Sequence, residues 1–263
     1  MLNRIEAKLR KFSQSFFYFL IYSTGFLVFV SFLRFRVEGK ENIPRKGRFI
    51  LAANHQNFFD GWFLASTIGS KRITFVIAKR VLKLKFFQIL AQLIGAVLIG
   101  NELEEYQNAL KRLNKTLTHG GPVGIFPEGD ISSHELPRRF KGGVAKLSLD
   151  SKTKVVPVYI NGTYNLRYFS YWLKRPEILI KVGKPIELYN YAQHCGNNLD
   201  QMAEVLREKI IGLSNVKEEN ESETSNCLAQ ESYTTPAREQ IVEELGVNES
   251  LNIWISFINW LRS

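Results

Sequence analysis

Short apolar runs alternate with longer amphipathic segments through the middle of the chain. Runs rich in β-branched and aromatic residues, bounded by turn residues, predict buried strands. The expected strands are 48–53, 73–78, 96–99, 122–126, 154–160 and 177–182. Apolar residues spaced about 3.6 apart predict helices, and these are 61–68, 81–93, 102–118, 142–150 and 199–213. This alternation predicts an α/β fold in layers, with a largely parallel or mixed central sheet.

An apolar segment precedes this domain. Residues 12–33 carry no charge, and a helix of that length could cross the core of a bilayer. Polar residues and Gly25 interrupt the segment, and basic residues flank both of its ends. Because such flanks give no clear orientation, we expect residues 1–34 to form a helical segment that associates with one leaflet. A buried soluble helix and a membrane span are the alternatives.

The C-terminal part of the chain changes character twice. Residues 214–239 are polar and poor in aromatic residues, which is typical of a flexible linker. Residues 240–263 end in an apolar stretch with polar residues at helical spacing, which predicts a short amphipathic helix. That helix could dock on a membrane or on the domain formed by residues 35–213.

Charge and cysteine content narrow the classes of partner. The 263-residue chain has a net charge of +10. Residues 61–101 hold six Lys or Arg and no acidic residue, a pattern that suits an anionic membrane surface. Nucleic acid is the less favoured partner, because none of the usual binding motifs occurs. The two cysteines, Cys195 and Cys227, have no metal-ligand spacing, so neither a disulfide framework nor a metal site is expected.

The candidate chemistry begins where the first strand ends. Asn54-His55 follows the predicted strand 48–53, and Asp60 stands just before the predicted helix 61–68. On a straight helix, residues five apart point in different directions, so the two side chains meet only if the backbone bends between them. Strand-to-helix junctions are where α/β proteins place their reactive groups. A neutral His55 could then act as a general base while Asp60 holds the ring and stabilises its charged form. A capping Asp and a hydrogen-bonded His are the alternative.

A second motif, Phe126-Pro127-Glu128-Gly129, follows the predicted strand 122–126. It places a carboxylate beside a glycine in a tight turn, although Pro and Gly around a Glu are also ordinary turn chemistry. His119 and His134 are expected to be solvated.

The order and spacing of four motifs resemble those of the glycerolipid acyltransferases, typified by 1-acylglycerol-3-phosphate acyltransferase. The resemblance covers roughly residues 35–190 and rests on Asn54-His55 to Asp60, Phe126-Pro127-Glu128-Gly129, Phe140-Lys141-Gly142-Gly143-Val144-Ala145 and Val155-Val156-Pro157-Val158. It implies that His55 is the general base and Asp60 its partner. It also implies a substrate site, for which we expect Asn54, Glu128, Gly129, Lys141, Gly142, Arg138 and Arg139.

Two arginines that the family usually carries are absent. Asn101 stands where one follows the Gly95–Gly100 segment, and Ile131 stands two residues after Glu128-Gly129. Because guanidinium groups bind phosphate through charge-assisted, often bidentate hydrogen bonds, recognition of a lysophosphatidate headgroup should be weaker. Arg138, Arg139 and Lys141 could substitute for them.

We therefore expect a membrane-associated O-acyltransferase of lipid biosynthesis. It would move a fatty acyl group from acyl-CoA or acyl-carrier protein to the hydroxyl of a lysolipid, with no metal or bound cofactor. The enzyme would be peripheral or monotopic, with its active site on the cytosolic side. A catalytically silent lipid-binding or scaffold protein of the same fold is the alternative.

Overall fold

The computed structural model describes most of the central part of the chain. The described residues are 16, 19–20, 23, 31–69, 72–82, 88–89, 91–92, 94–132, 134, 136–193 and 195–214.

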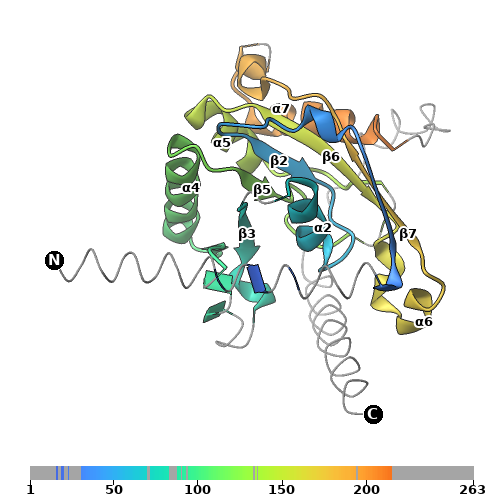
Figure 1. Cartoon of the computed structure of the whole chain (residues 1–263). Coiled ribbons are helices and arrows are strands. Elements are labelled where there is room, and N and C mark those ends of the chain that lie inside the picture. The colour runs from blue at the N-terminus through green and yellow to red at the C-terminus, as the bar shows by residue number, and fades with distance from the viewer. Residues whose placement is uncertain are drawn as a thin grey trace, which may run out of the picture.

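A seven-stranded sheet forms the centre of the molecule (Figure 1), in the order β1-β7-β6-β2-β5-β3-β4. Its strands are β1 (Arg34–Glu38), β2 (Ile50–Ala53), β3 (Thr74–Ala78), β4 (Val97–Ile99), β5 (Val123–Ile125), β6 (Val155–Asn161) and β7 (Glu177–Val182). All neighbouring strands run parallel except β6 and β7, which are antiparallel. The sheet is therefore mixed, as predicted.

Helices cover both faces of the sheet. On one face lie α4 (Leu103–Thr118), α5 (Gly143–Ser151) and α7 (Leu199–Ile211). On the other lies α2 (Asp60–Thr67), together with the short segments η3 (Tyr164–Arg167) and α6 (Phe169–Trp172). Because successive strand residues point to opposite faces, Ile50 and Ala52 join the first core while Leu51 and Ala53 join the second.

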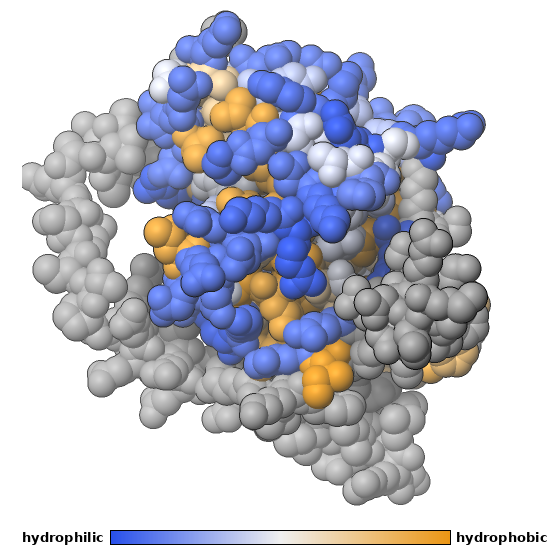
Figure 2. All heavy atoms as spheres, turned by 90° about the vertical axis from the view of Figure 1, so that its left-hand side faces the viewer, coloured by the Kyte–Doolittle hydropathy of each residue, from blue (hydrophilic) through white to orange (hydrophobic). Residues whose placement is uncertain are grey.

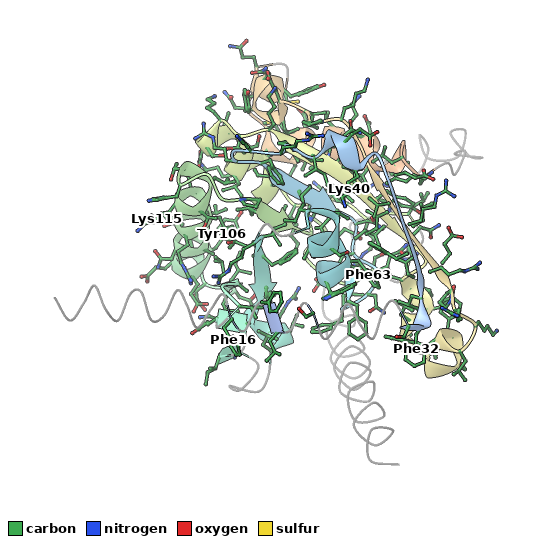
Figure 3. The ribbon with its side chains drawn as sticks, viewed as in Figure 1. Phe16, Phe32, Lys40, Phe63, Tyr106 and Lys115 are labelled. Atoms are coloured by element: carbon green, nitrogen blue, oxygen red, sulfur yellow. The ribbon has the colours of Figure 1, made fainter. Side chains whose placement is uncertain are left out.

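Side chains on the helices follow the same division. Tyr106 lies on the inner side of α4 and Lys115 on its outer side (Figure 3). Phe63 of α2 is fully buried against the sheet. The part of the α4-bearing face that is drawn in colour is mostly hydrophilic, with hydrophobic areas between the hydrophilic residues (Figure 2).

The expected elements are largely confirmed, with shifts of one or two residues at their ends. The prediction of a helix over 81–93 was wrong at its start, where the 3-10 turn η2 (Lys79–Val81) is followed by a non-helical Leu82. Helical residues occur within 88–92. Strand β1 was not predicted, and neither were the short segments η1 (Lys40–Asn42), η3, α6 and η4 (Leu188–Ala192).

Several predicted segments lie largely or wholly outside the described residues. These are the N-terminal segment 1–34, the linker 214–239 and the C-terminal helix 240–263. Among the residues that the structure describes, no helix combines the length and apolar character needed to cross a membrane.

Candidate active site

The two predicted motifs meet at one edge of the sheet. Strands β2 and β5 are parallel neighbours, so their carboxyl ends lie side by side. His55 follows the end of β2, and the segment Phe126 to Gly129 follows the end of β5. The topology thus brings together residues about seventy positions apart in the sequence.

His55 and Asp60 form a direct contact, as predicted. Nδ1 of His55 lies 3.0 Å from Oδ2 of Asp60. The same carboxylate oxygen accepts the backbone N–H groups of Gln56, at 2.6 Å, and Asn57, at 2.7 Å. Because Asp60 opens α2 and receives the N–H groups of the residues before it, the chain bends there, and this bend turns His55 toward the carboxylate.

The contact fixes which nitrogen of His55 can act as a base. An ionised carboxylate can only accept hydrogen bonds, so Nδ1 carries the proton and Nε2 keeps its lone pair. Nε2 has no hydrogen-bond partner among the described residues. The side chain of His55 is 18% exposed while that of Asp60 is 0% exposed. Solvent therefore reaches the imidazole but not the carboxylate behind it.

An aromatic stack supports the imidazole ring from one side. The ring of His55 lies parallel to that of Phe126, with the centroids 4.1 Å apart. Phe126 stacks in turn on Phe75 of β3, at 6.3 Å between centroids. The aromatic stack thus fixes the plane of the His55 ring, in addition to the hydrogen bond that the ring makes with Asp60.

The carboxylate of Glu128 links its own turn to the backbone at His55 and at Arg138. One oxygen accepts the N–H of His55 at 2.8 Å, and the other accepts the N–H of Arg138 at 3.1 Å. The carbonyl of His55 in turn accepts the N–H of Ser132 at 2.6 Å. Burial raises the pKa of Glu128, and the two backbone hydrogen bonds and the Arg138 guanidinium oppose this rise. The geometry favours a positioning role for Glu128 over a direct substrate contact.

Gly129 occupies a position that suits glycine. Its φ is +78°, in the left-handed region, and a Cβ there would lie 2.6 Å from Nζ of Lys141. Lys141 therefore passes directly over this turn, and its backbone N–H donates to the carbonyl of Pro127 at 2.9 Å. Gly129 and Lys141, both predicted residues of the substrate site, therefore lie close together.

Asn54 is used within the sheet. Its side-chain amide donates to the carbonyl of Ile160 at 2.9 Å and accepts the N–H of the same residue at 2.7 Å. The residue is buried. This geometry favours a structural link between β2 and β6 over the predicted substrate contact.

The three remaining predicted site residues have different surroundings: one packs between helices, and the two arginines lie partly exposed. Gly142 packs on α7, where an added Cβ would lie 2.9 Å from Cβ of Leu199. Arg139 pairs with Asp200 of α7 at 3.3 Å, and both side chains are largely exposed. Arg138 lies nearer the turn, with its Nε 3.6 Å from Glu128. Of the two predicted arginines, Arg138 alone contacts the catalytic loops.

Two cations at this edge had not been assigned to the site. Lys79 and Arg80 directly follow β3, whose parallel neighbour is β5. Lys79 pairs with Glu105, and Arg80 pairs with Asp130. The sequence signal was available, because any residue that follows a parallel strand reaches the same edge of the sheet. Both residues belong to the basic segment 61–101, whose charge pattern suits an anionic membrane surface.

Within the part of the chain that the structure describes, no group of three or more His, Cys, Asp or Glu side chains could hold a metal ion. His119 is exposed and contacts its own helix. His134 is also exposed.

Comparison with known proteins adds an independent line of information. The family model described as Acyltransferase matches residues 34–161. This segment begins with β1 and ends with β6, and it contains His55, Asp60 and Glu128.

Several curated proteins share moderate sequence identity with the chain. A 1-acyl-sn-glycerol-3-phosphate acyltransferase of Borreliella burgdorferi is 29% identical over 131 residues, which cover 49% of this chain and 52% of that protein. The matched part thus spans about half the length of that relative. A protein of the same name from Bacillus subtilis is 25% identical over 181 residues, covering 68% of this chain and 88% of the relative. Another, from Pseudomonas aeruginosa, is 29% identical over 182 residues, covering 66% and 68%.

A solved structure shares the fold. The 1-acyl-sn-glycerophosphate (LPA) acyltransferase PlsC from Thermotoga maritima superposes with a TM-score of 0.58 at 23% identity. The superposition covers 80% of this chain and 83% of the other.

Proposed function

We propose that this chain, whose residues 34–161 match the family model described as Acyltransferase, is a glycerolipid acyltransferase that transfers a fatty acyl group from a thioester to the hydroxyl of a lysophospholipid. The observation that carries this proposal is the His55–Asp60 contact, in which Nδ1 is held and Nε2 has no hydrogen-bond partner among the described residues, on a side chain that is 18% exposed. The donor would be acyl-CoA or acyl-carrier protein.

The proposed reaction needs no covalent protein intermediate. Nε2 of His55 takes the proton of the acceptor hydroxyl as its oxygen attacks the thioester carbonyl carbon. The C–O bond forms, the C–S bond breaks, and the leaving thiolate takes the proton from the imidazolium. Asp60 stays ionised throughout and stabilises the imidazolium between these steps.

The aromatic stack and the loop contacts serve this chemistry by limiting motion. General-base catalysis requires the base within hydrogen-bond reach of the proton it removes. The ring plane of His55 is set by Phe126, and its backbone is set by Glu128 and Ser132. Little reorganisation of the base is therefore needed when the acceptor binds.

The relatives support a phosphate-bearing acceptor, because each of those described above is named a 1-acyl-sn-glycerol-3-phosphate acyltransferase. We propose 1-acylglycerol-3-phosphate as the first acceptor to test. Asn101 and Ile131 occupy the positions where the sequence comparison led us to expect arginines. The headgroup must then be bound by other cations.

We also propose that the enzyme works at a membrane surface, as a peripheral or monotopic protein. Its acyl donors point to the cytosolic side. The apolar side chains of Phe16, Phe19 and Leu20 in the N-terminal segment are exposed by about half or more. Such residues suit the boundary between lipid and water.

The test compares wild type with His55→Ala and Asp60→Asn. Purified proteins are given an acyl thioester and 1-acylglycerol-3-phosphate in mixed micelles, and both thiol release and the mass of the lipid product are followed. We expect His55→Ala to lose about 10²- to 10⁴-fold in kcat, the range usual for a general base. Asp60→Asn should also lose kcat, because an amide cannot stabilise the imidazolium as a carboxylate does.

His119→Ala is the matched control, since His119 is exposed at the end of α4, and its activity should equal that of wild type. Undiminished transfer by His55→Ala would overturn the assignment of the base. A wild-type protein that binds lipid but releases no thiol would instead support the silent lipid-binding alternative, which the absence of the two expected arginines favours.

A further inference from the structure

A pair of charged residues lies at the same sheet edge as His55, outside the catalytic contact. Arg80 directly follows β3, and Asp130 follows the turn that contains Glu128 and Gly129. A terminal nitrogen of the Arg80 guanidinium, Nη2, donates to a carboxylate oxygen of Asp130 and lies 3.4 Å from the carbonyl oxygen of Gly129. The two side chains are 49% and 44% exposed.

The pair is connected to the catalytic base through very few residues. Arg80 contacts Gly129, and the adjoining Glu128 holds the backbone N–H of His55. A lysolipid that presents its hydroxyl to His55 carries its headgroup only a glycerol unit away. A charged group on this turn is therefore within range of the headgroup.

Arg80 is anchored in a way that leaves part of its guanidinium available. Its contacts with Gly129 and Asp130 use Nη2, while Nη1 and Nε have no partner among the described residues. The N–H groups on these two nitrogens can each donate a charge-assisted hydrogen bond to a phosphate oxygen. Lys141, whose Nζ lies over Gly129, adds a second cation at the same turn.

Asp130 has two opposite effects on such a ligand. As a hydrogen-bond acceptor it fixes the position of Arg80, which favours binding. As an anion it cancels part of the local positive charge and repels a phosphate at close range. An asparagine at this position could keep the hydrogen bond and remove the charge, so the two effects can be separated.

We propose that the Arg80–Asp130 pair sets the selectivity of the enzyme for the acceptor headgroup. Arg80 binds an anionic phosphate, and Asp130 weakens that binding through its charge. This inference rests on the proposed acyl transfer and adds to it the residues that recognise the acceptor.

The experiment measures kcat and KM of wild type, Arg80→Gln and Asp130→Asn with oleoyl-CoA as donor. The acceptors are 1-oleoylglycerol-3-phosphate and the uncharged 1-oleoylglycerol, each in the same mixed micelles. Arg80→Gln should raise the KM for the phosphate-bearing acceptor about tenfold or more, because a charge-assisted hydrogen bond is lost. Asp130→Asn should lower that KM about two- to fivefold, as expected for one partly solvated charge.

Three readouts separate headgroup recognition from a general structural effect. The KM for oleoyl-CoA and the KM for 1-oleoylglycerol should stay unchanged in both variants. In the double variant, the acceptor KM should lie below that of Arg80→Gln but above that of wild type, because the repulsive charge is removed while the Arg80 donor is still missing. Asp150→Asn removes another partly exposed acid, which pairs with Lys146 on α5, and it should behave as wild type.

An unchanged acceptor KM in Arg80→Gln would overturn the inference, as would a raised acceptor KM in Asp130→Asn. Wild-type transfer to 1-oleoylglycerol without transfer to the phosphate-bearing acceptor would also overturn it, while leaving the acyltransferase assignment intact. Absence of transfer to either acceptor would overturn both.

Discussion

At the scale of single residues, one carboxylate oxygen organises the catalytic turn. Oδ2 of Asp60 binds the His55 ring and the N–H groups of Gln56 and Asn57. The oxygen that bends the backbone is therefore also the one that orients the imidazole, so the shape of the turn and the position of the base have the same origin.

Glu128 is the second buried carboxylate of the site, and burial affects its pKa more than its hydrogen bonds do. Its side chain is 0% exposed, and burial is the largest influence on its pKa, which is raised. The backbone N–H groups of His55 and Arg138 oppose that effect without cancelling it. Glu128 therefore stabilises the geometry of the active site at some expense in the free energy of unfolding.

This balance predicts how stability depends on pH. Between the unfolded pKa of Glu128, close to 4.5, and its raised folded pKa, the folded protein binds more protons than the unfolded chain. The free energy of unfolding contributed by this group therefore falls as pH rises through that window and is constant above it. Replacing Glu128 with Gln should remove this contribution. Urea unfolding of both proteins from pH 4 to 7 measures it.

The readout is the difference in unfolding free energy between wild type and Glu128→Gln. As pH rises from 4.5, the unfolding free energy of wild type should fall relative to that of Glu128→Gln. This trend should hold even if the variant is less stable overall through the loss of one hydrogen bond. A difference that is independent of pH, or that moves the other way, would contradict the raised pKa.

At the scale of elements, a glycine sets how closely two helices approach. Gly142 precedes α5 and faces Leu199 at the start of α7. Its backbone angles, φ −63° and ψ −2°, are open to any residue. Glycine is therefore required here by the proximity of α7 and not by backbone conformation.

Gly142→Ala should lower the free energy of unfolding by about 1–3 kcal/mol, the usual effect of overpacking a close contact. Thermal or urea unfolding measures the change. The control is Gly61→Ala in α2, where an added Cβ would meet its nearest neighbour, a ring carbon of Phe126, at 4.0 Å. That variant should be as stable as wild type or up to about 1 kcal/mol more stable, because alanine favours helix. Equal effects at both positions would show that the α5–α7 contact is not tight.

The element order also explains why the reactive groups share one edge. Parallel strands place all their carboxyl ends at the same side of a sheet, which is where ligands of open α/β sheets bind. Strands β2, β5 and β3 are consecutive neighbours, and they deliver His55, Glu128 and Arg80 respectively. Each side chain comes from a loop, while the strands beneath fix the spacing.

At the scale of the whole molecule, charge and apolar exposure act together. The net charge of +10 should draw the protein to anionic lipid, with each Lys or Arg at the surface contributing about 1 kcal/mol. Exposed apolar residues would add a contribution that salt does not screen. Salt dependence can therefore separate the two.

Full-length protein should bind vesicles that contain anionic phospholipid more tightly than purely zwitterionic vesicles. This preference should shrink between about 0.1 M and 1 M salt, as the Debye length falls from about 10 Å to about 3 Å. Co-sedimentation at several salt concentrations measures both effects. Residual binding at high salt would report the apolar contribution, and absence of binding to either kind of vesicle would contradict the proposed membrane association.

Much of this protein could be predicted from its sequence because the signals involved are local. Periodicity identified the buried strands and the principal helices, since the apolar spacing of an element depends only on its own residues. The His55–Asp60 contact was predicted on the same basis, because both residues belong to one strand-to-helix junction. The four ordered motifs indicated a glycerolipid acyltransferase, and the family model described as Acyltransferase matches residues 34–161.

Tertiary structure alone decided the features that depend on distant partners. Strand β1 pairs with β7 across some 140 positions. The sequence Arg34–Glu38 alone does not identify β7 as its partner. Asn54 and Glu128 are predicted substrate-site residues, and only the structure shows their protein partners: Asn54 binds the backbone of Ile160, and Glu128 binds that of His55. A polar residue satisfies whichever donors and acceptors the fold brings to it, so its partner is fixed only when the chain packs. The Arg80–Asp130 pair could not be predicted either, because its members are fifty residues apart and meet only when the chain packs.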